Sequence, residues 1–210
     1  MAIVTSDHLI DPVEEFTATL LSAARTASAG DVLYTFGIRP DHPATGFGYL
    51  EVGDTPAEER TGDGVPVHAE DPVQHFRLER FVEKPDEATA REYVGSGRFL
   101  WNSGMFVWRT DAILDEVRRQ LPEHAQRIGA AVAHDGAPDF ALRLVEAFEP
   151  LERVSVDFGI MENARDVRCV AATFSWHDVG SFTALADHLP TDADGNAHRG
   201  RLYGVAAHDN

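Results

Sequence analysis

The sequence FLWNSGMFVW, residues 99–108, is a strongly apolar stretch of strand length that a polar triplet, Asn102-Ser103-Gly104, interrupts. The apolar residues on both sides of the triplet predict a buried strand. A side-chain amide inside such a strand costs free energy unless it finds hydrogen-bond partners. We therefore expect Asn102 to have a specific partner.

Outward from this strand, short apolar runs alternate with segments of helical periodicity. Further strands are expected at 2–4, 32–36, 73–82 and 167–174, and helices at 11–29, 85–96, 110–121, 123–133 and 139–148. This alternation is typical of an α/β layered fold with a mostly parallel sheet. The acidic, proline-dotted segment 54–72 reads as an exposed loop.

The expected helix starts carry capping residues. Asp11 stands as N-cap before Pro12, and Glu14 can complete a capping box. Thr110 and Asp111 are expected to cap the helix after the central strand. Pro85-Asp86 opens a shorter helix that Gly95 and Gly97 end.

Composition excludes several classes of protein. The net charge of −17 gives no basic stripe for a nucleic acid, and no apolar run approaches the length of a membrane span. A single cysteine, Cys169, cannot form an internal disulfide, so the expected compartment is the reducing cytoplasm. An acidic protein that binds phosphates must place its few cations locally or recruit a metal ion.

One residue stands out among the cations. The 210 residues hold 18 lysines and arginines, and Lys84 is the only lysine among them. A compact ammonium and a planar guanidinium are not interchangeable at a crowded phosphate, which makes Lys84 a candidate functional residue. The alternative is that one lysine survives by compositional chance.

Polar residues gather where the expected strands end, which is where open α/β sheets bind ligands. Asp7 follows the first strand, Asp178 follows the last, and Glu83-Lys84 follow the extended stretch 73–82. Two carboxylates brought together suit Mg²⁺ held jointly with phosphates. The alternative is that each aspartate only caps a following helix. His8 and His177 flank the aspartates, but they lack the tight spacing of zinc ligands.

Six motifs, in order along the chain, resemble those of sugar-1-phosphate nucleotidyltransferases. They are SDHLI (6–10), GIRP with PATGFGY (37–49), FVEKPD (81–86), WNSGMF (101–106), VDFGIME (156–162) and WHDVGS (176–181). The WNSGMF and IME forms are similar to those of mannose-1-phosphate guanylyltransferases in particular.

The resemblance implies a Rossmann-like, GT-A-like mixed sheet with flanking helices. The nucleotidyltransferase domain would cover 1–190 and lack its N-terminal glycine-rich loop, and 191–210 would begin a C-terminal extension. It implies transfer of a guanylyl group from GTP to mannose 1-phosphate, with Mg²⁺ as cofactor. The oligomeric state stays open, and a homo-oligomer is compatible with the resemblance.

The same resemblance implies roles for particular residues. Asp7 and Asp178 would hold the metal, and Lys84 would contact the sugar phosphate as a catalytic residue. The sugar hydroxyls would be held by substrate-binding residues, which are Gly46, Glu83, Asn102 and Asp157.

Some positions depart from the family pattern. Asn163 stands where many members have a lysine after IME, and Phe47 replaces the usual tyrosine. The alternatives are another sugar-1-phosphate nucleotidyltransferase, or a non-catalytic sugar-phosphate-binding fragment or subunit.

Overall fold

The computed structural model describes residues 1–53, 73–180, 189, 192 and 195–196. The strands are Ala2–Ile3 (β1), His8–Asp11 (β2), Leu33–Ile38 (β3), Tyr49–Val52 (β4), His75–Val82 (β5), Phe99–Val107 (β6), Val167–Ala171 (β7) and Ser175–Asp178 (β8). The helices are Val13–Ala27 (α1), Glu87–Ser96 (α2), Thr110–Gln120 (α3), Pro122–Val132 (α4), Phe140–Phe148 (α5) and Val156–Gly159 (α6), with a 3-10 turn at Met161–Asn163 (η1). The expected loop at 54–72 and nearly all of the expected extension at 191–210 lie outside the described residues.

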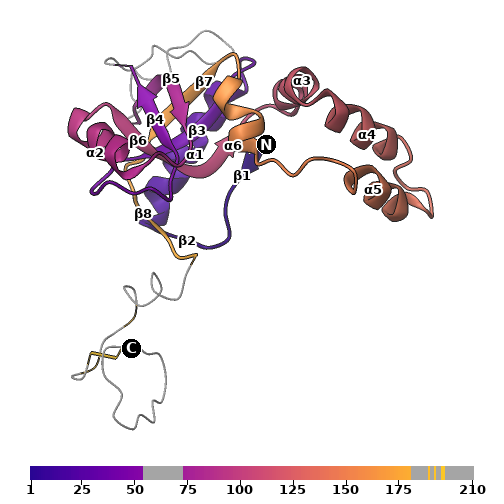
Figure 1. Cartoon of the computed structure of the whole chain (residues 1–210). Coiled ribbons are helices and arrows are strands. Elements are labelled where there is room, and N and C mark those ends of the chain that lie inside the picture. The colour runs from indigo at the N-terminus through magenta and orange to yellow at the C-terminus, as the bar shows by residue number, and fades with distance from the viewer. Residues whose placement is uncertain (54–72, 181–188, 190–191, 193–194, 197–210) are drawn as a thin grey trace.

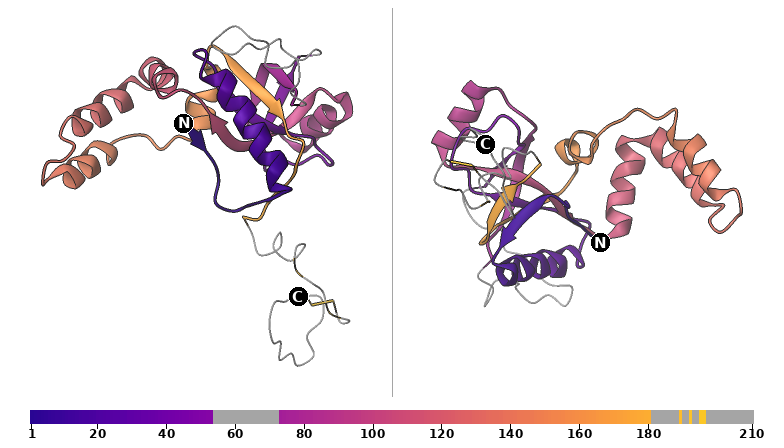
Figure 2. Two further views of the ribbon diagram at one scale, coloured as in Figure 1. Left: turned by 180° about the vertical axis from the view of Figure 1, so that it is seen from behind. Right: turned by 90° about the horizontal axis from the view of Figure 1, so that it is seen from below.

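The chain forms a body around the sheet and a helical arm, α3 to α5, that extends away from it (Figures 1 and 2). The predicted α/β fold with a mixed sheet is confirmed, whereas the prediction of a mostly parallel sheet is wrong. Among the described strands only β3 and β7 pair in parallel, and the other pairings are antiparallel. The alternation rule assumes that each helix joins neighbouring parallel strands. Here α2 joins β5 to β6, which are not neighbours, and the arm leaves the sheet altogether.

Strand β6 organises the six-stranded sheet, whose order is β1-β6-β3-β7-β5-β4 with an added β6–β4 pairing. At Trp101, β6 pairs with Ile38 of β3 on one edge and with Tyr49 of β4 on the other. At its far end, residues 106 and 107 pair with β3 and β1. Hence β4 and β1 share one edge of β6, and on that edge no described strand pairs with residues 102–105.

Apolar side chains fill both faces of the sheet. Alternating residues of β3 and β6, including Phe36 and Trp101, pack with α1 and α2 on one face. Leu33 and Phe106 point to the other face and pack with α3, α6 and η1. Cys169 lies in this second core, and burial raises the pKa of its thiol to about 12.

The helix starts were predicted unevenly. Asp86 caps α2 by accepting a hydrogen bond from Thr89 N at 2.8 Å, and Gly97 ends α2 in the left-handed conformation, both as expected. The capping box of α1 is wrong, because Asp11 pairs with Ser175 as the last residue of β2 and Pro12 takes the N-cap position. Arg109, rather than Thr110, is the N-cap of α3. None of the described helices is long and apolar enough to cross a membrane.

The packing between the two cores can be tested by a substitution at Gly37 in β3. A Cβ added there would lie 2.5 Å from Leu100 Cδ1 and 2.6 Å from Cys169 Sγ. We expect Gly37→Ala to lower the free energy of unfolding by about 1–3 kcal/mol through overpacking. Urea unfolding measures this quantity.

The matched control is Gly129→Ala on the exposed face of α4, where an added Cβ meets no atom within 4 Å. That change should raise the free energy of unfolding by about 0.5–1 kcal/mol, because alanine favours the helix. Equal effects of the two substitutions would contradict the packing described for Gly37.

Candidate functional site

The pairing of β2 with β8 brings two distant aspartates together. His8 is the Cα partner of Asp178, and Val179 N donates to the carbonyl of Asp7 at 2.9 Å. A Cβ added to Gly180 would lie 3.0 Å from Asp178 Oδ1 and 3.7 Å from Asp7 Oδ2, so both carboxylates border the same space. The alternative that Asp7 caps a helix does not hold, because β2 follows it and Pro12 is the N-cap of α1.

These two carboxylates are the residues that could hold a divalent metal ion. Their oxygens are ligands that Mg²⁺ prefers, and Mg²⁺ is usually bound by one or two carboxylates plus substrate phosphates and water. In the part of the chain that the structure describes, no group of three or more His, Cys, Asp and Glu side chains could hold a metal. The pair therefore fits an ion shared with a phosphate ligand and does not fit a protein-only cage.

His8 lies next to this aspartate pair and contacts β8. Its Nδ1 accepts a hydrogen bond from Trp176 Nε1 at 2.9 Å, and the two rings meet edge to face. Burial lowers the pKa of His8, although the negative charges of Asp178 and Asp7 act in the opposite direction. The neutral ring of His8 therefore accepts a hydrogen bond from Trp176 of β8 and helps to hold this strand beside β2. His8 thus has a structural contact.

A second group of polar residues surrounds Asn102, in the open segment of β6. Asn102 is 7% exposed, and its Oδ1 accepts a hydrogen bond from the Thr35 hydroxyl at 2.8 Å. Its Nδ2 donates to Asp157 Oδ1 at 2.9 Å, and its backbone N donates to the carbonyl of Gly48 at 2.8 Å. The expectation of specific partners for this amide is confirmed.

Glu83 lies against the same group, directly after β5. Only 10% of its side chain is exposed, and its Oε2 has no hydrogen-bond partner in the described structure. Burial raises the pKa of Glu83, and the negative charge of Asp157 raises it further, while Lys84 lowers it. A buried carboxylate oxygen without a partner is costly, which points to a ligand that supplies a donor.

Lys84 has an unusual backbone. Its φ is 45°, in the left-handed region that costs a side-chain-bearing residue about 1–2 kcal/mol. Its Nζ lies 3.6 Å from Glu83 Oε1, and 60% of its side chain is exposed. Backbone strain at a residue with an exposed cation is often found at ligand sites.

Aromatic rings connect the two groups. The ring of Phe47 lies 5.2 Å from Trp101 and 5.3 Å from Trp176, centroid to centroid. A cavity of about 390 Å³, bordered by these three rings, also reaches Asp178. A larger cavity of about 710 Å³ lies on the helical arm between α4, α5 and residues 149–155, away from these polar residues.

The structure thus brings Glu83, Lys84, Asn102 and Asp157 into one group and Asp7 with Asp178 into another. Gly46 is different, because an added Cβ there would meet no atom within 4 Å. The predicted contact of the Gly46 backbone with the sugar stays a prediction. Gly48 is the glycine that packs against the polar group, because an added Cβ there would lie 2.4 Å from Glu83 Oε2. The sequence reasoning missed Gly48, although it stands in the same TGFGY segment.

The chain is similar to known proteins over most of its length. A family model described as "Nucleotidyl transferase" matches residues 1–195. The xanthan biosynthesis protein XanB of Xanthomonas campestris pv. campestris (strain B100) is 37% identical over 203 residues, which are 95% of this chain and 39% of XanB. The mannose-1-phosphate guanylyltransferase of Escherichia coli (strain K12) is 36% identical over 201 residues, which are 95% of this chain and 40% of that protein.

The chain therefore spans about two fifths of the length of these curated relatives. Among solved structures, the mannose-1-phosphate geranyltransferase of Thermus thermophilus superposes with a TM-score of 0.72 and 30% identity. The match covers 92% of this chain and 50% of that one.

Metal binding at Asp7 and Asp178 can be measured with Mn²⁺ as a paramagnetic substitute for Mg²⁺. We expect Asp7→Asn and Asp178→Asn each to weaken Mn²⁺ binding about tenfold or more, because each removes one of two charged ligands. Asp11→Asn, on the exposed end of β2, is the control and should leave binding unchanged. Water-proton relaxation gives the affinity, and equal affinities in all variants would show that the pair is no metal site.

Proposed function

The chain belongs to the nucleotidyl transferase family, and from this premise we propose that it carries the sugar-phosphate side of a guanylyltransferase site. The reaction would transfer a guanylyl group from GTP to mannose 1-phosphate and give GDP-mannose and pyrophosphate. Relatives named mannose-1-phosphate guanylyltransferase support the choice of sugar and nucleotide.

The observation that carries the proposal is the unpartnered carboxylate oxygen of Glu83. This oxygen lacks a hydrogen-bond donor, and a sugar hydroxyl is a small, neutral donor. Gly48, which has no side chain, leaves room for Glu83 Oε2 beside its backbone, and Asn102 and Asp157 add amide and carboxylate groups to the same cluster. Several converging acceptors and donors are what a polyhydroxylated ring requires, whereas a phosphate would be repelled by two carboxylates.

The phosphate of the sugar is assigned to Lys84. This ammonium is exposed and lies beside Glu83, so a sugar held by Glu83 would place its phosphate within reach of Nζ. At the other group, Asp7 and Asp178 would hold Mg²⁺, which neutralises phosphate charge when bound.

Transfer at phosphorus is mainly positioning and charge neutralisation. A phosphate oxygen of mannose 1-phosphate forms the new bond to the α-phosphorus of GTP, and the bond from that phosphorus to pyrophosphate breaks. Glu83, Asn102 and Asp157 would orient the sugar, and Lys84 would hold the attacking phosphate. The aromatic contacts of Phe47 with Trp101 and Trp176 would fix the distance between the sugar and metal groups.

We place the reaction in the cytoplasm, where GTP is available. The single cysteine, Cys169, is fully buried in the second core and has a raised pKa, so it offers no thiol for a disulfide. This is compatible with a reducing compartment.

The assignment of Lys84 can be tested by labelling, because Lys84 is the only lysine in the chain. Reductive methylation with ¹³C gives one side-chain dimethylamino signal, which we expect to shift saturably with mannose 1-phosphate and hardly at all with mannose. In calorimetry, Lys84→Gln should weaken mannose 1-phosphate binding by about 10- to 100-fold, as for loss of a charge-assisted contact. Arg91→Gln, on an exposed ion pair of α2, is the control. A signal that ignores the sugar phosphate would remove Lys84 from the site.

The role of Glu83 predicts a pH dependence. Ionised Glu83 accepts a sugar hydroxyl, so affinity should rise with pH through the pKa of Glu83, which burial first and Asp157 second hold above its usual range. Asp157→Asn removes the second effect, so the acid limb of the affinity should move to lower pH. Calorimetry of both proteins over the same pH series isolates this shift, because the ionisation of the ligand is common to both. An acid limb that does not move would contradict the coupling of Asp157 to Glu83.

A further inference from the structure

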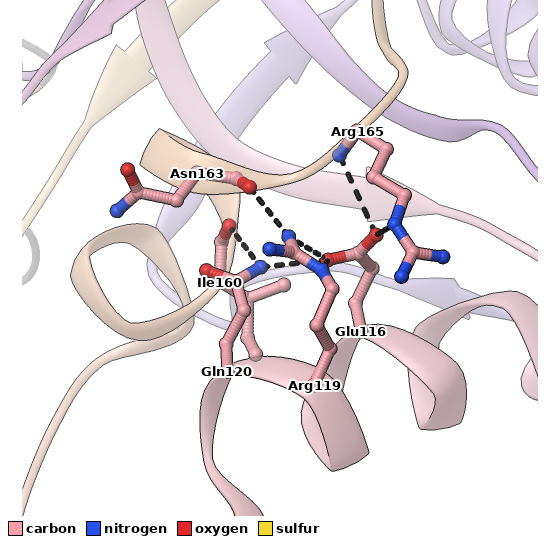
Figure 3. A network of polar contacts seen from close by, with 6 residues as sticks. All are labelled: Glu116, Arg119, Gln120, Ile160, Asn163 and Arg165. Carbon is pink, nitrogen blue, oxygen red and sulfur yellow. Dashed lines mark hydrogen bonds and ion pairs between the residues drawn. The ribbon is translucent and has the colours of Figure 1, made fainter.

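A network of polar side chains joins the helical arm to the segment that carries Asp157 (Figure 3). Its centre is the carboxylate of Glu116 in α3, whose side chain is 9% exposed. Glu116 Oε2 accepts hydrogen bonds from Arg119 Nε at 3.0 Å and from Gln120 Nε2 at 2.8 Å. Glu116 Oε1 accepts from Arg165 N at 3.4 Å.

The two side chains that Glu116 orients then hold backbone carbonyls across the gap. Gln120 Nε2 donates to the carbonyl of Ile160 at 3.0 Å, and Arg119 Nη2 donates to the carbonyl of Asn163 at 2.5 Å. These carbonyls stand at the two ends of η1 (Figure 3). We call Glu116, Arg119 and Gln120, with the η1 backbone that they hold, the α3–η1 clamp.

The clamp lies where the chain leaves the body and where it returns. The main chain enters the arm after Trp108 and comes back at Ser155, where α6 begins (Figure 1). Apolar packing accompanies the polar contacts, because a Cβ added to Gly159 would lie 3.2 Å from Leu121 Cδ1. The returning segment is therefore fixed to α3, the first helix of the arm.

The returning segment carries two charges that face the sugar-phosphate group. Asp157 in α6 accepts the hydrogen bond from Asn102, and Glu162 lies in η1 between the two clamped carbonyls. The negative charges of both carboxylates raise the pKa of Glu83. Asp157 is also linked to Glu83 by geometry, because it binds Asn102, and Asn102 and Glu83 both lie against Gly48. Lys84 is the positive group that opposes them.

We propose that Glu116 is a positioning residue for the sugar-phosphate site: through Arg119 and Gln120 it fixes η1 and α6, and thereby places Asp157 and Glu162 beside Glu83 and Asn102. This inference rests on the proposed function of that site. Among the described residues, Glu116 makes its polar contacts with Arg119, Gln120 and Arg165, so it would act on the site through the backbone that this network holds.

The burial of Glu116 separates it from the other ion pairs of the arm. Asp115 pairs with Arg118 and Glu123 pairs with Arg127, but all four side chains are 44–67% exposed. Exposed pairs of this kind contribute little to stability. Burial opposes the ionisation of Glu116, yet its hydrogen bonds from Arg119, Gln120 and Arg165 lower its pKa overall, so it is held as a charged acceptor.

The test compares Glu116→Gln with Asp115→Asn, the adjacent and exposed carboxylate on the same helix. A glutamine amide has one acceptor oxygen in place of two, so it cannot accept from the donors around both oxygens of Glu116, and it cannot balance the charge of Arg119. We expect hydrogen–deuterium exchange in peptides covering 156–163 to accelerate in Glu116→Gln, and affinity for mannose 1-phosphate to fall about tenfold. The acid limb of that affinity should also move to lower pH, since displaced Asp157 and Glu162 no longer raise the pKa of Glu83. Asp115→Asn should match the wild type in all three measurements.

A second variant, Gln120→Ala, guards against general unfolding of Glu116→Gln. It removes the bonds from Gln120 Nε2 to the Ile160 carbonyl and to Glu116, but it leaves the Glu116 carboxylate charged and bound by Arg119 and Arg165. It should give the same changes in the same direction, with a smaller amplitude. Faster exchange with unchanged affinity and pH profile would overturn the positioning role and leave the clamp a purely structural device. Unchanged exchange in both variants would overturn it as well. If the wild-type chain does not bind mannose 1-phosphate, the proposed function fails first and the inference fails with it.

Discussion

The hydrogen bonds of the Asn102 side chain are the contacts on which the arrangement of the site depends. A primary amide inside an apolar strand must have its donors and acceptor satisfied, and here the partners come from different parts of the chain. Thr35 belongs to β3, Asp157 belongs to α6, and the neighbouring backbone N of Asn102 binds Gly48. One buried residue thus fixes the positions of three parts of the chain relative to one another. They are the central sheet, the glycine turn and the segment that returns from the arm.

Asn102 can make these contacts because of the topology of β6. Strands β4 and β1 occupy the two ends of one edge of β6, and β3 occupies the other edge. The open stretch between them is where side chains from outside the sheet can reach the strand. Both strands on this edge run antiparallel to β6, whereas the sequence predicted a mostly parallel sheet. The strands whose direction was predicted wrongly are therefore the ones that border the open stretch of β6 at the site.

The sequence predicts the parts of this structure that local chemistry determines. Asn102 has the partners that it needed, and the helix that Pro85-Asp86 was expected to open begins at Glu87. The sequence placed Asp178 after the last strand, whereas Asp178 is the final residue of β8. It could not predict the β2–β8 ribbon, because its four-residue strands carry little periodicity and their pairing spans most of the chain. It also could not separate Gly48 from Gly46. Both glycines suit a turn, and only the position of the Glu83 side chain decides which of them must lack a Cβ.

The proposed function requires a chain of net charge −17 to bind a phosphate, and the distribution of its charges is compatible with this. Its buried or half-buried carboxylates are committed to arginines or held near one another: Glu51 binds Arg80 and Arg98, and Glu116 binds Arg119. Glu83 instead faces Asp157 and Glu162, and like charges in a partly buried group raise its pKa. Such a group repels a phosphate and attracts hydroxyl donors. The anion must then be met at the rim of the group, by a cation that is not locked in a planar ion pair. Lys84 lies at this rim, with an exposed ammonium 3.6 Å from Glu83 Oε1. Its backbone is left-handed, and this strained conformation turns the chain between β5 and α2.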